Sequence, residues 1–304
     1  MSSLAASPAD QIRRIPDPEV AVPPIALPTL ALFGGALALW IASSALYLAG
    51  TSPWPVVIAV NAIASFLLFT VSHDSAHNSI SSNPAVTTWL GRASTIMFAP
   101  HAGFRTWRFI HMQHHLNTNE DERDPDSYAH DGPRWQLPLR WLTIDLQYMV
   151  FYLPKLAKRP RAERVELMAT WAVVSAVAIA CALTGHFVDL LVVYFIPIRL
   201  SVLFLAWSFD YLPHAGLEQH RGKDGRFRAT RNRIGGERLL SPLLLNQNYH
   251  LVHHLHPLIP FYRYVQVWRR SEEDYLANDP ALSTVRGRPL TTDEYRRIRQ
   301  LAEH

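Results

Sequence analysis

The chain has 304 residues, of which 49% are hydrophobic and only 18% are charged, and it contains one cysteine, Cys181. A single cysteine excludes an intrachain disulfide and any cysteine-based zinc or iron–sulfur site. The net charge of +4 does not indicate nucleic-acid binding, because the basic residues are distributed as in a membrane protein. Long apolar runs alternate with charged ones, which is typical of a polytopic membrane protein.

The chain starts with a polar, proline-rich stretch, and no cleavable signal peptide is evident there. We expect residues 1–23 to form a flexible cytosolic tail. Four later runs are long and apolar enough to cross a bilayer, which takes roughly 20 residues; they are 26–49, 54–72, 167–184 and 187–209. Short turns join the first two runs and the last two, so the sequence predicts two tight transmembrane hairpins.

Two further runs lie between the hairpins. The run 85–100 is shorter and carries Arg92, so it is expected to dip into the membrane or lie on it. The run 135–156 mixes aromatic with charged residues, as expected of an interfacial helix. The predicted fold class is therefore all-α, with about four transmembrane helices and a cytoplasmic helical cap. We expect the membrane domain to cover 24–270 and a cytosolic extension to cover 271–304.

Lysine and arginine residues orient this topology. Two lie in the N-terminal tail, ten between 101 and 166, and fifteen after 209, whereas neither short turn has any. By the positive-inside rule, both termini and the segment 73–166 face the cytoplasm. The histidine groups described next then share that side of the membrane.

Eight of the 15 histidines fall into three groups, HDSAH, HMQHH and HLVHH. Spacings of three and four residues place side chains on one helical face. Neutral imidazole is a good ligand for iron, zinc and copper, and eight imidazoles exceed the four ligands of a structural zinc ion. The sequence therefore predicts a site for two metal ions, with the ligands His73, His77, His111, His114, His115, His250, His253 and His254.

The boxes HxxxH, HxxHH and HxxHH resemble those of the membrane fatty-acid desaturase superfamily, over about residues 30 to 270. Four stretches are most similar to the desaturase-like β-carotene hydroxylases: HDSAHNS (73–79), NTNEDERDPD (117–126), FDYLPH (209–214) and NQNYHLVHHLHPLIPFYRY (246–264). The resemblance implies two non-haem iron ions, O2 as co-substrate and hydroxylation of a β-carotene-type ring. Neighbouring branches desaturate acyl chains, so a fatty acid desaturase acting on acyl-lipid or acyl-CoA is the alternative.

The resemblance also implies a ninth ligand, His214, at the end of the fourth span. Asp210 lies four residues earlier, where it is either a carboxylate ligand or an acceptor that orients a ligand. Asp74, Asp121 and Asp124 are candidate partners for the N–H groups of the ligands. Arg199 lies mid-span, where a charge is costly, and it is either functional or paired with another helix. The other histidines are expected to be surface, loop or interface residues: His101, His130, His186, His220, His256 and His304.

No flavin, nicotinamide or haem module is recognisable, so the electrons are expected from a separate donor such as a ferredoxin with its reductase. The arginine-rich segment 221–238 is either its docking surface or a solvated or lipid-contacting loop. The other expected partners are membrane lipids and a lipophilic substrate, a carotenoid or an acyl chain. A non-redox membrane metal-binding protein, such as a zinc hydrolase, is the remaining alternative.

Overall fold

A computed structural model describes residues 22–217 and 225–302. Nearly all of the predicted N-terminal tail lies outside these residues, as do His220, His304 and the start of the arginine-rich segment.

Within the described residues, four helical runs are long and apolar enough to cross a membrane: Leu27–Leu48 (α2), Trp54–Ala76 (α3), Arg161–Leu183 (α8) and Phe187–His214. They confirm the predicted all-α polytopic class with four spans. The last run is built from α9 (Phe187–Leu190), η3 (Leu191–Phe195), α10 (Ile196–Leu205), η4 (Ala206–Tyr211) and α11 (Leu212–His214). Both η3 and η4 are π-helical, a geometry that is frequent at functional sites.

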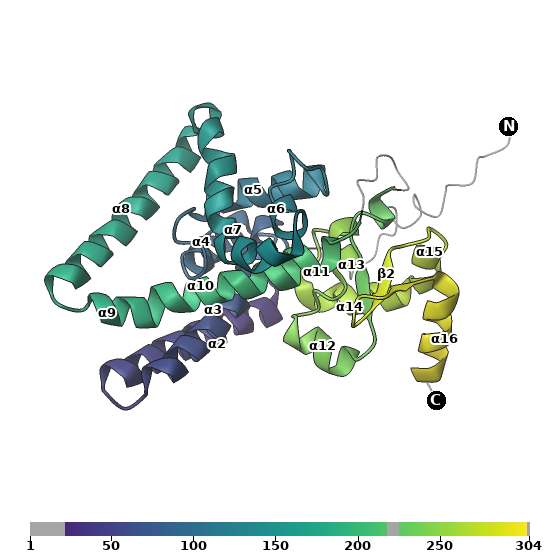
Figure 1. Cartoon of the computed structure of the whole chain (residues 1–304), viewed down its shortest axis with the longest axis horizontal. Coiled ribbons are helices and arrows are strands. Elements are labelled where there is room, and N and C mark those ends of the chain that lie inside the picture. The colour runs from purple at the N-terminus through teal and green to yellow at the C-terminus, as the bar shows by residue number, and fades with distance from the viewer. Residues whose placement is uncertain (1–21, 218–224, 303–304) are drawn as a thin grey trace.

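The two hairpins differ in packing. Helices α2 and α3 lie side by side, and α10 packs along α3. Helix α8 diverges from α10 after their short turn, and only 6% of its most apolar stretch is buried (Figure 1). The second hairpin is therefore open rather than tight. From Val165 onward the exposed large side chains of α8 are apolar, as expected of a lipid-facing helix: Val165, Met168, Val173, Val177, Ile179 and Leu183.

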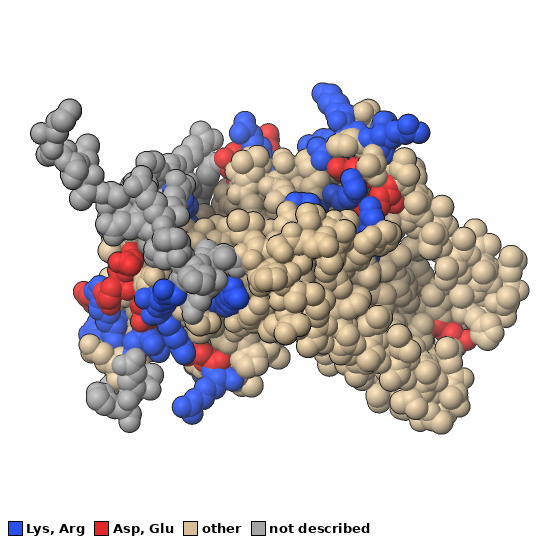
Figure 2. All heavy atoms as spheres, turned by 180° about the vertical axis from the view of Figure 1, so that it is seen from behind, with Lys and Arg blue, Asp and Glu red and all other residues tan. Residues whose placement is uncertain are grey.

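Figure 2 shows that charged side chains gather over part of the molecule and leave a broad body almost without them. The spans form this uncharged body, which is the surface that a bilayer covers. The chain is thus an integral membrane protein.

Shorter helices form the cap between the hairpins: α4 (Pro84–Thr95), α5 (Phe104–Asn117), α6 (Ser127–His130), η1 (Arg134–Gln136), α7 (Leu137–Tyr152) and η2 (Leu153–Lys158). The run predicted over 85–100 contains most of α4. The N-cap of this helix is Asn83, whose side chain accepts a hydrogen bond from the Ala85 amide at 3.0 Å. The predicted interfacial helix is α7, and it packs across α10.

The C-terminal part holds small elements: η5 (Gly225–Phe227), β1 (Asn232–Ile234), α12 (Glu237–Leu243), α13 (His250–Leu255), η6 (Phe261–Arg263), α14 (Tyr264–Arg270), α15 (Glu272–Leu276), β2 (Leu282–Thr284), β3 (Pro289–Leu290) and α16 (Thr292–Ala302). Strand β2 lies centrally, parallel to β1 and antiparallel to β3, which adds a small sheet to the predicted helices. Leu251 and Val252 of α13 share one buried core with Tyr275 and Tyr295. Residues after 270 therefore help to hold the third histidine box in place.

Candidate metal centre

The first histidine box lies at the C-terminal end of α3. His73 lies in the last turn, and His77 caps the helix, five residues beyond the predicted end of the span. Asp74 between them is buried; it accepts hydrogen bonds from Thr29 Oγ1 at 3.1 Å and from the Phe261 amide at 3.3 Å. One carboxylate therefore ties the first box to α2 and to the segment that follows the third box.

The second box lies on α5, which starts after Gly103. This glycine has a φ of 69°, and a Cβ there would lie 3.0 Å from Thr170 Oγ1 of α8, so the turn favours glycine. Trp107 stacks on the His111 ring with centroids 5.2 Å apart and an interplanar angle of 6°. The stacking of Trp107 thus helps to hold the His111 ring in one orientation on α5.

The third box is α13, a helix of only six residues. It is fixed from outside: the Leu251 amide donates to Asn232 Oδ1 at 3.0 Å, and Leu251 and Val252 are fully buried. Its short length is compatible with a fixed position because the packing, rather than helix propensity, stabilises it.

All nine predicted ligands come together and divide into two groups. In each group, one ligand atom per residue lies within 4.8 Å of all the others. The larger group is His73, His77, His111, His115 and His253, and the smaller is His114, His214, His250 and His254. His214 of α11 thus lies together with histidines of the second and third boxes.

The imidazoles meet through their Nε2 atoms. His253 Nε2 lies 3.0 Å from His73 Nε2 and 2.9 Å from His115 Nε2. The corresponding His77–His111 distance is 2.8 Å. For metal–imidazole bonds of about 2.1 Å, ligand atoms at right angles around the ion lie about 3 Å apart. The donor set therefore fits metal ions, and imidazole is a ligand that suits iron.

Burial keeps most of these rings neutral. It lowers the pKa well below the usual range, and neighbouring histidines lower it further, at His77, His111, His115, His250, His253 and His254. Neutral imidazole is the form that binds metal. At His114 burial also lowers the pKa, but the carboxylates of Asp124 and Asp126 outweigh it and raise the pKa to about 10.

Three of the Nδ1 atoms have partners that orient the rings. His114 Nδ1 lies 2.8 Å from Asp124 Oδ1, His250 Nδ1 lies 2.9 Å from Gln247 Oε1, and His253 Nδ1 lies 3.0 Å from the Tyr264 hydroxyl. Such contacts fix the tautomer that leaves Nε2 free for a metal. Asp124 was anticipated from the sequence. Gln247 and Tyr264 were missed, although Gln247 lies only three residues before His250.

The other candidates lie apart from the two groups. Asp74 is 3.9 Å from His73 Nδ1 and serves as a structural anchor. Asp121 lines a separate surface pocket, and its side chain makes no hydrogen bond to these histidines within the described chain. His256 contacts the Tyr275 hydroxyl, and His186 contacts Asp189 in the second hairpin turn.

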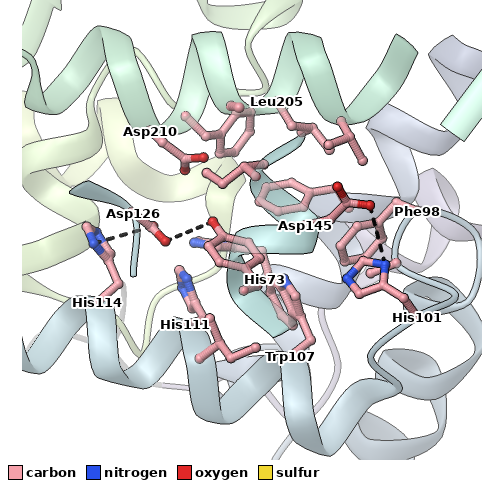
Figure 3. A pocket seen from close by; sticks show the side chains of 18 of the residues that line it. His73, Phe98, His101, Trp107, His111, His114, Asp126, Asp145, Leu205 and Asp210 are labelled. Atoms are coloured by element: carbon pink, nitrogen blue, oxygen red, sulfur yellow. Dashed lines mark hydrogen bonds and ion pairs between the residues drawn. The ribbon is translucent and has the colours of Figure 1, made fainter. Parts of the chain in front are cut away.

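A pocket extends from the two histidine groups between α5, α7 and the α10–η4 run (Figure 3). His73, His111 and His114 line one end together with Asp126 and Asp210. Apolar side chains form the walls: Phe69, Phe98, Ala99, Trp107, Ile110, Ile144, Val202, Leu205, Ala206 and Phe209. Asp210 therefore faces the pocket beside His114, although it is not part of either histidine group.

The charge in the fourth span is paired. Arg199 donates to both carboxylate oxygens of Asp145 on α7, at 2.6 and 2.8 Å, and to the Leu142 carbonyl at 2.7 Å. Of the two roles considered for Arg199, the structure shows the pairing with another helix. The bidentate pair compensates the cost of a charge among apolar helices.

These features define a class of protein: a polytopic helical membrane protein in which buried histidines form two adjacent groups fit for metal ions. The family model for "Fatty acid desaturase" matches residues 49–286, and the chain belongs to this family.

The curated relatives include acyl-lipid desaturases. The chain is 26% identical to the sn-2 acyl-lipid omega-3 desaturase (ferredoxin) of Arabidopsis thaliana chloroplasts, over 74% of this chain and 56% of the relative. It is 25% identical to the sn-1 acyl-lipid omega-3 desaturase (ferredoxin) of Synechocystis sp., over 69% and 65%. It is 24% identical to the acyl-lipid omega-3 desaturase (cytochrome b5) of the Arabidopsis endoplasmic reticulum, over 76% and 67%. The chain thus spans between about half and two thirds of the length of these relatives.

Proposed function

We propose that the chain is an O2-dependent di-iron desaturase that introduces a double bond into the acyl chain of a lipid. The observation that carries this proposal is the pair of buried histidine groups at the end of an apolar pocket, in a chain of the fatty acid desaturase family. The relatives named above are acyl-lipid desaturases, which favours the acyl chain over the carotenoid ring that the sequence motifs suggested.

In this proposal the group of five histidines holds one iron ion and the group of four holds the other. When bound, the two ions supply an oxidant from O2 that removes hydrogen from an unactivated C–H bond. The protein binds and aims the substrate. Phe69, Trp107 and Phe209 wall the pocket next to the histidines, exclude water there and hold an acyl chain along the α10–η4 run.

The site faces the cytoplasm in this proposal, in line with the basic residues around it. Electrons come from a separate carrier. The relatives' names include ferredoxin and cytochrome b5, and we propose a donor of this kind for this chain.

Expression in two hosts tests the proposal, one with ordinary acyl lipids and one that also accumulates β-carotene. Fatty acids and pigments are extracted and compared with those from cells that express His253→Ala. This variant lacks one of the ring nitrogens of the group of five histidines. New double bonds in acyl chains, absent from the variant, support the desaturase. A hydroxylated carotenoid without new unsaturated acyl chains overturns it in favour of the ring hydroxylase.

A further inference from the structure

The pocket in Figure 3 has a second polar end, away from the metal centre. His101 and Asp145 line this end. Between them and the histidine groups the walls are apolar, apart from Tyr148, whose hydroxyl is bonded to Asp126 at 2.8 Å. Val202 and Asp210, eight residues apart on the α10–η4 run, both line the pocket. A polar group therefore lies at a set distance from the reaction centre.

The distal group is held rigidly. Arg199 binds Asp145 through two hydrogen bonds, and the Leu146 amide donates to Asp145 Oδ1 at 3.0 Å. The backbone of His101 is fixed separately, because Trp171 Nε1 of α8 donates to its carbonyl at 2.5 Å. Three elements thus fix the Asp145 carboxylate and the His101 backbone relative to the pocket.

The position of the His101 ring determines what it offers to a ligand. Its Nδ1 lies 3.6 Å from Asp145 Oδ2, and the ring nitrogen that faces a carboxylate is the one that carries the hydrogen. Burial lowers the pKa of His101, and Arg199 lowers it further while Asp145 raises it, so the ring is neutral near pH 7. The Nε2 atom then carries a lone pair and acts as a hydrogen-bond acceptor.

This acceptor is available. No hydrogen bond to the His101 ring nitrogens occurs among residues 22–217 and 225–302, and the side chain remains 22% exposed. An ion pair that only fastens α7 to α10 requires Arg199 and Asp145. It does not require an imidazole at this end of the pocket.

We propose that His101 Nε2 binds a hydroxyl group of the substrate and thereby sets which C–H bond reaches the metal centre. The inference rests on the proposed desaturase function and adds a substrate class to it: lipids with a hydroxyl group on the chain. An ester carbonyl fits less well, because it offers no hydrogen to the Nε2 lone pair.

A feeding experiment tests this proposal. Cells that express the chain receive an unsubstituted fatty acid or one of a series of acids that differ only in the position of a single hydroxyl group. Desaturated products are measured by mass spectrometry at equal levels of membrane-inserted protein. From the net contribution of one hydrogen bond between neutral groups, we expect the acid with the hydroxyl group at one position to be preferred about 3- to 10-fold over the unsubstituted acid.

Two variants assign the preference to His101. His101→Leu is expected to lose the preference for the hydroxylated acid while still desaturating the unsubstituted acid. His101→Gln, which keeps a hydrogen-bond acceptor, is expected to retain part of this preference. Phe98→Leu changes the same end of the pocket without a polar group and serves as the matched control. Equal use of all acids by the wild type, or an unchanged preference in His101→Leu, overturns the proposal. A wild type that desaturates none of the acids refutes the proposed function instead. The wild-type comparison is decisive even if a variant fails to accumulate.

Discussion

Tyr264→Phe isolates the contribution of a residue that orients a metal ligand. The Tyr264 ring is fully buried, and its hydroxyl lies 3.0 Å from His253 Nδ1. With Nε2 directed at the metal, Nδ1 carries the hydrogen and donates it to the hydroxyl oxygen. The phenylalanine ring fills the same space, so the substitution removes this acceptor together with the contact of the hydroxyl with Gln247.

Loss of such a partner lowers metal affinity by about 10- to 100-fold, which corresponds to about 1.4 to 2.7 kcal/mol. Tyr152→Phe is the matched control. Its ring is also fully buried, and its hydroxyl donates to Glu163 Oε1 at 2.7 Å, away from the histidine groups. Both substitutions remove one buried hydroxyl and its hydrogen bond.

The assay measures the iron that detergent-purified protein retains against increasing concentrations of a chelator. We expect Tyr264→Phe to release iron at about 10- to 100-fold lower chelator concentration than the wild type. Tyr152→Phe should follow the wild-type curve. Superimposable curves for the two variants would refute the reasoning, because the Tyr264 hydroxyl would then contribute only to folding.

Three further predictions concern other parts of the structure. His253→Ala should abolish turnover while the protein still enters the membrane fraction, since His253 Nε2 lies within 3.0 Å of the Nε2 atoms of both His73 and His115; retained turnover would remove it from the ligand set. Arg199→Leu should lower the free energy of unfolding by about 3 kcal/mol. This is the low end of the range for removing one partner of a buried ion pair, because the Arg199 side chain is 38% exposed. The double variant Arg199→Leu/Asp145→Leu should recover most of the lost free energy of unfolding. An Arg199→Leu variant as stable as the wild type would contradict this prediction. Chelation of the metal should lower the Tm, because metal binds only the folded state, and added iron should restore it; an unchanged Tm would show that the folded chain holds no metal.

The spans and the histidine boxes could be predicted because their signals are local. Hydropathy identifies an apolar run without reference to the rest of the chain, and helical spacing places His111, His114 and His115 near one another on a single helix. His214 followed from the resemblance in FDYLPH. The ends of the spans were less predictable: α3 runs on to Ala76 because packing against α2 and the third box buries its polar last turn.

The division of the histidines into five and four could not be predicted. It separates His114 from its neighbour His115 and depends on how α3, α5, α11 and α13 dock. Gln247 and Tyr264 have no distinctive spacing, and their roles depend on the fold. The strands of the small sheet are two or three residues long, too short to show an alternating pattern.

Metal analysis of the purified chain tests the central claim most directly. Expressed with iron available and purified without chelators, the wild type should contain two iron ions per chain, one for each histidine group. His214→Ala, which alters only the group of four, should lose the iron of that group preferentially. One zinc ion per chain, with no iron, would contradict the di-iron account and favour a non-redox metal-binding protein.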